Sequence, residues 1–312
     1  MIKIVMIIMN LILFIVVAPL LSGIISKIKN NIRMRKGQGI LQPYYNLAKL
    51  FSKGEVVSET ASWIFRSAPF VVLASMLVSA MLIPVFILRS PLNHAGDFLA
   101  LIFIFALGRF FLALAALDTG SSFGGMGASR EMFISSLVEP AFCLVVFAVS
   151  LQSGSTDISA FSGKHALSVS SIVAALTLFL VTIAETSRIP VDNQETHLEL
   201  TMVHEAMVLE YSGGSLALIE MAAYIKQMIL FFLIAQIVFP VGLPIGQAGY
   251  ANDLALIFFW VAWYLARIVV IAIVVALAEV SVAKMRLFRV ADFLGLAFVL
   301  GVIAVVCAIL GV

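Results

Sequence analysis

The chain has 312 residues, of which 62% are hydrophobic and 12% are charged, and its formal net charge at pH 7 is +2. About 25% of the residues of a soluble globular domain are charged, so this composition excludes a water-soluble protein. The small net charge and the lack of a basic run with interleaved aromatic residues exclude a nucleic-acid-binding protein.

The sequence predicts an all-α, polytopic membrane protein. Eight apolar runs reach the length of about 20 residues that crosses a bilayer. The first run is too long for a signal peptide and lacks a small-residue cleavage site. The third run is the least regular because Arg109 interrupts it. We therefore expect a single transmembrane domain over residues 1–312, with spans at about 3–26, 67–89, 98–117, 132–152, 168–188, 215–239, 252–280 and 291–311.

The distribution of Lys and Arg predicts the orientation. Connections after the first, third, fifth and seventh runs hold thirteen of the nineteen Lys and Arg residues, against three on the opposite side. Cytoplasmic connections are enriched in these residues. Both termini are therefore expected outside the cytoplasmic membrane. The cytoplasmic-side connections are then about residues 27–66, 118–131, 189–214 and 281–290.

The first connection predicts an amphipathic helix at the membrane surface. Its apolar side comprises Ile40, Leu41, Tyr44, Leu47, Ala48 and Phe51, and its polar side Gln42, Asn46, Lys49 and Lys53. Three interpretations stay open: a membrane-surface anchor, an entrance for a hydrophobic ligand such as a quinone, or a docking helix for a soluble partner. The candidate docking or entrance residues are Arg33, Arg35, Lys36, Gln42, Pro43, Tyr44, Tyr45 and Lys49.

Residues 117–131 are rich in glycine, at positions 120, 124, 125 and 127. This composition predicts a tight, close-packed loop. A phosphate-binding loop is not expected, because no lysine follows the glycines at the required spacing and no strand precedes them.

The segment from Glu185 to Glu220 is dense in ionisable residues. It carries seven of the seventeen carboxylates and two of the four histidines, and long apolar runs flank it. Acidic and imidazole groups at the edge of a bilayer suggest proton handling. The residues are Glu185, Asp192, Glu195, His197, Glu199, His204, Glu205, Glu210 and Glu220.

Local spacing within this segment gives two further expectations. Glu185 and Arg188 are three residues apart, so they should share a helix face until Pro190 ends that helix. Residues 194–210 contain no Gly or Pro and predict a short helix. Glu195 and Glu199 would stack on it, and their repulsion would raise their pKa values toward the range of a proton relay. A solvated loop helix is the alternative.

Ionisable residues also occur within the spans. Because a charge in lipid is costly, these side chains should point into the protein and pair there. Glu220 and Lys226 are six residues apart and do not share a face, so their partners must come from other helices. The set of expected charge partners is Arg109, Arg130, Arg188, Lys226, Arg267 and Glu279, and Glu139 joins the carboxylates.

The two cysteines, Cys143 and Cys307, lie inside apolar runs and are expected to be small buried hydrophobes. The sequence has no Cys or His pattern with metal-ligand spacing. We therefore expect no metal, iron–sulfur cluster or other cofactor in this chain.

Three motifs resemble one family, the membrane subunit 1 family of respiratory complex I, which includes relatives in membrane-bound nickel–iron hydrogenases. The first is RKGQGILQPYYNLAKL, and the second is Arg130 followed by Glu139. The third is ETSRIPVDNQETHLEL with the later EYSG. In the third motif the matching positions are Glu185, Arg188, Pro190, Asp192, Glu195, Glu199, Leu200, Glu210, Tyr211, Ser212 and Gly213.

Differences from complex I favour the hydrogenase branch of the resemblance. His197 stands where complex I has a glutamate, and three extra residues lie between Leu200 and Glu210. Ala223 stands where complex I has a Glu-Tyr pair, while Glu220 lies one turn earlier. The combination of THLELTMVHEAM with LDTGSSFGGMGASRE is similar to hydrogenase-4 and formate hydrogenlyase.

The resemblance implies a non-catalytic membrane subunit of an oxidoreductase complex. Its partners would be soluble hydrogenase large and small subunits, iron–sulfur subunits, antiporter-like membrane subunits and the lipid bilayer. The nickel–iron site and the iron–sulfur clusters would lie in the partner subunits. The implied proton path comprises Glu139, Glu185, Asp192, Glu195, His197, Glu199, His204, Glu205, Glu210 and Glu220.

Two other functions are alternatives. A quinone-chamber subunit of an NADH:quinone oxidoreductase would use Tyr44 and Tyr45 to gate the quinone tail. A stand-alone transporter would require an internal inverted repeat, and the sequence contains none that we find.

Overall fold

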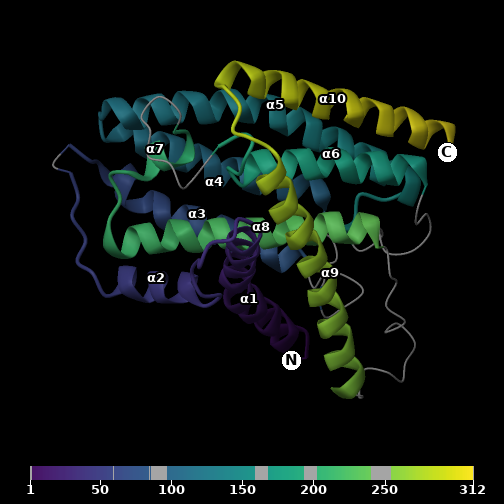
Figure 1. Ribbon diagram of the computed structural model, residues 1–312, viewed down its shortest axis with the longest axis horizontal. Helices are drawn as coiled ribbons and strands as arrows, with labels where there is room; N and C mark the ends of the chain where they lie inside the picture. Colours follow the sequence, from purple (N-terminus) through teal and green to yellow (C-terminus); the bar gives the residue numbers. More distant parts are fainter. Residues whose placement is uncertain are drawn as a thin grey trace.

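The computed structural model describes residues 2–58, 60–83, 85, 97–158, 168–192, 202–239 and 254–311. Over these residues the chain is all-α, with no strand (Figure 1). The helices are α1 (Ile2–Ile32), α2 (Gln42–Phe51), α3 (Trp63–Leu82), α4 (Phe98–Asp118), α5 (Ser122–Ser153), α6 (Val169–Glu185), α7 (His204–Val208), α8 (Gly213–Val238), α9 (Leu254–Ser281) and α10 (Leu287–Leu310).

The eight expected spans correspond to α1, α3, α4, α5, α6, α8, α9 and α10. In the described part of the chain, seven helices are long and apolar enough to cross a membrane, and α6 is a shorter apolar helix. The prediction of an all-α, polytopic membrane protein is therefore confirmed. Arg109 does not break α4, because its side chain points into the bundle and is only 7% exposed.

Two helices depart from the direction of the rest. In Figure 1, α3, α4, α5, α6, α8 and α10 run roughly alongside one another, whereas α1 and α9 cross α8 steeply. Large apolar side chains such as Phe65, Phe105 and Phe231 fill the interior, while Phe103 and Ile309 are exposed. Apolar side chains on the outside suit a protein surrounded by lipid. The crossing of α1 and α9 over α8 brings their charged ends to the middle of the bundle.

The predicted glycine loop at residues 117–131 is wrong, because α5 already begins at Ser122. The Ser121 side chain accepts a hydrogen bond from the Gly124 N–H at 3.0 Å and so caps the helix. Glycine serves close packing here instead of a turn. A Cβ added to Gly127 would lie 2.9 Å from Ala206 Cβ on α7. Gly127 therefore lets α7 approach α5 closely.

The predicted helix at 194–210 is also wrong as a continuous element. Residues 202 and 203 are not helical, and the helical part of the described segment is α7 alone. Asp192 holds the start of α7, since its Oδ2 accepts the N–H groups of Val203 and His204 at 3.3 and 3.2 Å. Glu195, His197 and Glu199 lie outside the described residues.

A third difference concerns the end of α6, which stops at Glu185 instead of reaching Arg188. Ser187 has a left-handed φ of 49°, and the Arg188 N–H donates to the Ile183 carbonyl at 3.0 Å. A left-handed residue with this hydrogen bond is a common way to end a helix. Arg188 therefore leaves the face of Glu185, and the expected i, i+3 pair does not form.

The close approach of α5 and α7 makes a prediction about two neighbouring glycines. Gly127→Ala should lower the free energy of unfolding by about 1–3 kcal/mol, because its Cβ has no room against Ala206. Gly125→Ala is the matched control, since a Cβ there meets nothing within 4 Å. It should stabilise the helix by about 0.5–1 kcal/mol. Thermal unfolding of the purified protein in detergent measures both, and destabilisation of equal size at the two positions would contradict the packing.

Candidate functional site: buried charge clusters around a polar cavity

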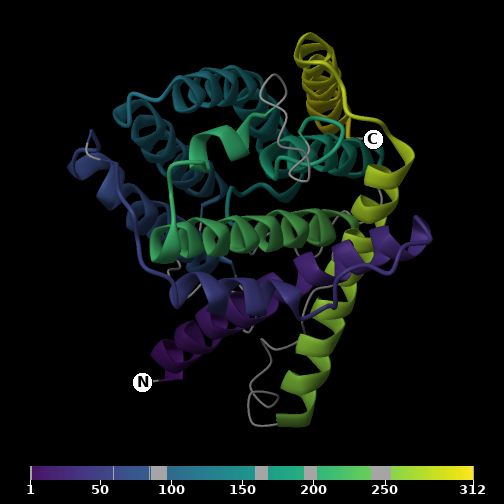
Figure 2. The same cartoon turned by 60° about the vertical axis from the view of Figure 1, so that its left-hand side comes forward.

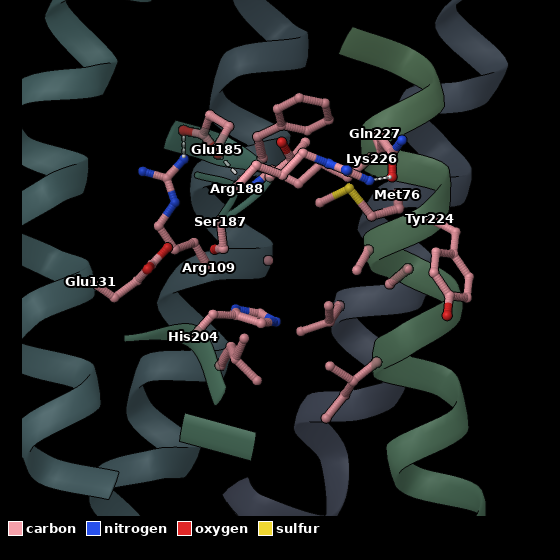
Figure 3. Close-up of a pocket in the computed structure, with 18 of the residues that line it drawn as sticks. Met76, Arg109, Glu131, Glu185, Ser187, Arg188, His204, Tyr224, Lys226 and Gln227 are labelled. Carbon is pink, nitrogen blue, oxygen red and sulfur yellow. Dashed lines mark hydrogen bonds and ion pairs between the residues drawn. The ribbon is translucent and has the colours of Figure 1, made fainter. Parts of the chain in front are cut away.

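A cavity of about 90 Å³ lies among the ends of α6 and α7 and the walls of α4, α5 and α8 (Figure 3). Its size allows a few water molecules. Apolar residues of α3, α4 and α8 form one part of its lining. The polar part consists of Ser22, Arg109, Glu131, Glu185, Thr186, Ser187, Arg188, His204, Tyr224, Lys226 and Gln227.

The first charge cluster, here the Glu185 cluster, joins four helices. Arg109 of α4 donates to Glu185 Oε1 of α6 at 2.6 Å and to Glu139 Oε1 of α5 at 3.0 Å. Lys226 of α8 forms an ion pair with Glu185 Oε2. Two cations thus face two carboxylates inside the bundle, and Lys226 finds its partner on another helix, as the spacing required.

The second cluster, here the Glu279 cluster, reaches the cavity through Arg188 and Gln227, which both line it. Lys29 Nζ of α1 contacts Glu279 Oε2 of α9 at 2.6 Å, and Arg188 pairs with Glu279 Oε1. Arg188 also donates to the side-chain oxygen of Gln227 on α8 at 2.8 Å. The steep crossing of α1 and α9 over α8 is what brings these groups together, so the expectation that Glu279 points inward is met.

The two clusters share the cavity between them. Lys226 and Gln227 are adjacent on α8. Lys226 pairs with Glu185 of the first cluster, and Gln227 accepts a hydrogen bond from Arg188 of the second. Arg109 Nε, Arg188 Nε and Gln227 Nε2 are buried donors without a hydrogen-bond partner in the described part of the chain. Buried polar groups are rarely left unsatisfied, and a polar cavity is where ordered water meets that need. The geometry thus favours a hydrated space linking Glu185 to Arg188.

The connection between α9 and α10 contacts the acidic segment at Pro190 and Asp192 and holds it in place. Lys284 Nζ contacts Asp192 Oδ1 at 2.9 Å, and the Met285 N–H donates to the Pro190 carbonyl at 2.9 Å. Asp192 is 1% exposed and also holds the N–H of His204. This tether positions His204 at the cavity, and Asp192 itself does not line that cavity.

Other predicted site residues lie apart from the clusters. Arg130 donates to the Met202 carbonyl at 2.8 Å, and Arg267 donates to the Phe239 carbonyl at 2.7 Å. Glu205 and Glu220 are half-buried outside the cavity lining, and Glu210 is exposed. No group of three or more His, Cys, Asp or Glu side chains that could hold a metal occurs among the residues that the structure describes.

Sequence reasoning missed Lys29, Glu131, Gln227 and Lys284. It also missed four polar residues of the cavity lining, which are Ser22, Thr186, Ser187 and Tyr224. Lys29 and Lys284 served only as markers of orientation, because each lies in a basic connection. Glu131 and Gln227 gave no signal of their own. The one signal that could have pointed to them is their position next to predicted site residues, since Glu131 follows Arg130 and Gln227 follows Lys226 in the sequence.

The EYSG motif fastens the first connection to α8. The Tyr211 ring stacks on Phe65 with centroids 4.0 Å apart, and its hydroxyl donates to the Phe65 carbonyl at 3.0 Å. Burial raises the pKa of Tyr211, with Asp118 and Glu55 adding to the effect, so this hydroxyl stays a donor. Ser212 Oγ accepts the Val56 N–H at 2.8 Å. The motif therefore fixes the position of the chain between α2 and α3 relative to the start of α8.

The candidate docking or entrance residues surround α2. Arg35, Lys36, Tyr45 and Lys49 are exposed, Arg33 and Gln42 are half-buried, and Pro43 is buried. Tyr44 donates to the Val16 carbonyl of α1, and burial raises the pKa of its hydroxyl. The helix buries a single stripe, Pro43 and Leu47, so much of its expected apolar side is free to meet lipid or a partner.

Fold and site together define a class: an integral membrane protein whose interior holds paired charges around a polar cavity. The family described as NADH dehydrogenase matches residues 2–310, and the chain belongs to this family. This match and the relatives described next confirm the resemblance found in the three motifs.

Two relatives come from Escherichia coli (strain K12). Hydrogenase-4 component C is 34% identical over 297 residues, which cover 94% of this chain and 92% of the relative. Formate hydrogenlyase subunit 4 is 34% identical over 276 residues, which cover 87% of each. The fold is also that of a chain in the membrane-bound sulfane sulfur reductase, an archaeal respiratory membrane complex, with a TM-score of 0.83, 18% identity, and coverage of 99% of this chain and 100% of the other.

The tether between Lys284 and Asp192 can be tested by Lys284→Met. Loss of the cation leaves a buried carboxylate short of a partner, which should destabilise residues 188–192 and 202–208 locally by about 1–3 kcal/mol. Faster hydrogen–deuterium exchange in these segments would report it. Arg286→Gln is the control, because this exposed neighbour makes no side-chain capping bond. Equal exchange in both variants would contradict a tethering role.

Proposed function

We propose that this chain is the membrane-anchor subunit of a complex I-like nickel–iron hydrogenase and couples electron transfer in the soluble arm to proton translocation. The two relatives of the hydrogenase branch, each matched over most of its length, support this assignment. The soluble large and small subunits and the iron–sulfur subunits would carry the redox centres. Antiporter-like membrane subunits would be the other neighbours, and this chain would be non-catalytic.

One observation carries the coupling role: Glu185 lies between Arg109 and Lys226 at the wall of a polar cavity. Two neighbouring cations keep a carboxylate ionised, so Glu185 would accept a proton only when Lys226 or Arg109 moves away, and that movement would gate proton transfer. The unpartnered donors at the same cavity give water a place to carry that proton. Glu185 and the cavity together would form the central station of the path.

Glu139 gives the path a direction. Its side chain is 41% exposed although it lies in the span of α5, and Arg109 joins it to Glu185. A carboxylate exposed in the middle of a span is costly in lipid, so a neighbouring subunit should cover it. We place the antiporter-like neighbour on this face, with protons passing between it and the Glu185 cluster.

The basic first connection is the proposed docking surface for the soluble arm. Arg35 and Lys36 are exposed, and they belong to the positively charged side of the chain. By the distribution of Lys and Arg this side would face the cytoplasm, with both termini outside. The exposed face of α2 would complete the docking surface.

A quinone-chamber subunit is the second candidate, and the exposed Tyr45 on α2 is the observation that favours it. The volume of the polar cavity weighs against it, since 90 Å³ is well below the roughly 300–1,000 Å³ of pockets that take drug-sized ligands. Hydrogen turnover by the purified complex without quinone would support the first candidate. Photolabelling of residues 40–53 by a quinone analogue would support the second.

The role of Glu185 requires a variant that keeps the charges balanced. Glu185→Gln alone leaves Arg109 and Lys226 facing one carboxylate, and breaking a buried pair in this way costs about 3–5 kcal/mol. Poor assembly of that variant would therefore say little about protons. The double variant Glu185→Gln, Lys226→Met restores the balance. It should assemble, turn over hydrogen and lose the protons translocated per turnover.

Proteoliposomes with a pH-sensitive dye measure that proton yield. Asp292→Asn is the control, because this exposed carboxylate on α10 lies outside the cavity lining. A double variant with the proton yield of the unaltered complex would remove Glu185 from the path.

Docking can be tested by charge reversal. Arg35→Glu with Lys36→Glu should weaken binding of the soluble arm about tenfold or more, because two rim charges would then repel an acidic partner surface. A pull-down from detergent extract at two salt concentrations measures retention of the arm. Arg286→Glu with Arg289→Glu is the charge-matched control on the same side of the chain. Equal retention in both pairs would refute docking at the first connection.

A further inference from the structure

A second cavity, unconnected with the charge clusters in its lining, lies between α6, α8 and α9. Its volume is about 340 Å³, within the roughly 300–1,000 Å³ of small-ligand pockets. The lining is almost wholly apolar and includes Ala175 and Phe179 of α6, Ile234 and Val238 of α8, and Val270 and Val274 of α9. We name this cavity the α6–α9 groove. All its sides come from membrane-spanning helices.

The steep crossing of α9 over α8 explains why the groove exists. Helices that run alongside one another close their contact over many turns, whereas a steep crossing packs over a short stretch. Figures 1 and 2 show α9 diverging from α8 beyond the crossing. The space between them is then bounded by the start of α6 and the end of α8. The result is a wedge that the side chains of the described residues do not fill.

The rim of the groove carries a cation. Arg267 lies three and four residues before Val270 and Ile271 of the lining, so it extends the same face of α9. Its Nη1 donates to the carbonyl of Phe239, another lining residue, at 2.7 Å. Its Nε is buried without a partner, and no carboxylate among the described residues pairs with the guanidinium. This contrasts with Arg109 and Arg188, which both hold carboxylates.

A guanidinium within a span is costly unless an anion neutralises it. The groove therefore combines an apolar channel with an arginine at its edge that no carboxylate of the described residues neutralises. A phospholipid matches both features, because its acyl chain is apolar and its phosphate accepts the paired hydrogen bonds that a guanidinium donates. A quinone or a diacylglycerol would fill the channel but leave the arginine without an anion.

We propose that the α6–α9 groove is a specific phospholipid site, with one acyl chain between α6, α8 and α9 and the phosphate on Arg267. The lipid would close the wedge that the crossing of α9 leaves open. It would stabilise the position of α9 and thereby of Glu279 at the other end of that helix. The site is independent of the hydrogenase assignment, since it uses none of the cavity residues around Glu185.

The test uses the purified membrane complex in liposomes that contain phosphatidylglycerol with a photoactivatable diazirine on one acyl chain. After illumination, mass spectrometry should locate the label on peptides of α6, α8 and α9 that line the groove. Arg267→Gln should lower this labelling about tenfold, the loss expected for one charge-assisted hydrogen-bonded contact. Val270→Trp should lower it similarly by filling the groove. Diacylglycerol with the same diazirine chain should label poorly and equally in all variants.

Val299→Trp on the exposed face of α10 is the control and should leave the labelling unchanged. Equal phosphatidylglycerol labelling in the unaltered chain and in Arg267→Gln would overturn the proposal. A benzophenone side chain placed at Val274 gives a second readout. If it crosslinks a neighbouring polypeptide instead of lipid, the groove is a protein interface and the proposal is wrong.

Discussion

The structure depends on the neutralisation of Glu185 and Arg109 inside the bundle. Neither charge would be tolerated alone in an apolar interior, because the effective cost of burying an ion is several kcal/mol. Arg109 also holds Glu139, and Glu185 also holds Lys226. Four helices must therefore keep their relative positions for any of these charges to stay paired. The same requirement leaves a polar cavity at the centre of an otherwise apolar protein.

The charges also explain the unusual path of α1 and α9. Their steep crossing over α8 carries Lys29 and Glu279 to Arg188, where parallel packing would have left these groups in lipid. The crossing has a cost at another point, since it opens the wedge beside Arg267. The same crossing therefore accounts for the tightly paired cluster at Glu279 and for Arg267, which has no carboxylate partner in the described part of the chain.

Much of the fold followed from the sequence because lipid imposes a simple length rule. Each apolar run became a helix, and the expectation that Arg109, Lys226 and Glu279 point inward was met. Local exceptions escaped prediction where tertiary contacts overruled composition. Glycines 124, 125 and 127 are typical of a loop, yet all three lie in α5, and at Gly127 the missing side chain lets α7 pack closely.

The sequence by itself determined the class of protein, the spans, the family and the residue types that a proton path would use. Only the tertiary structure decided which charged groups pair with one another. Arg188 forms its ion pair with Glu279 instead of Glu185. Asp192 pairs with Lys284 and accepts a hydrogen bond from the start of α7. The physical reason is that hydropathy is a property of each segment alone. An ion pair between helices depends on crossing angles and rotations that no single segment encodes, and these are settled when all the helices pack together.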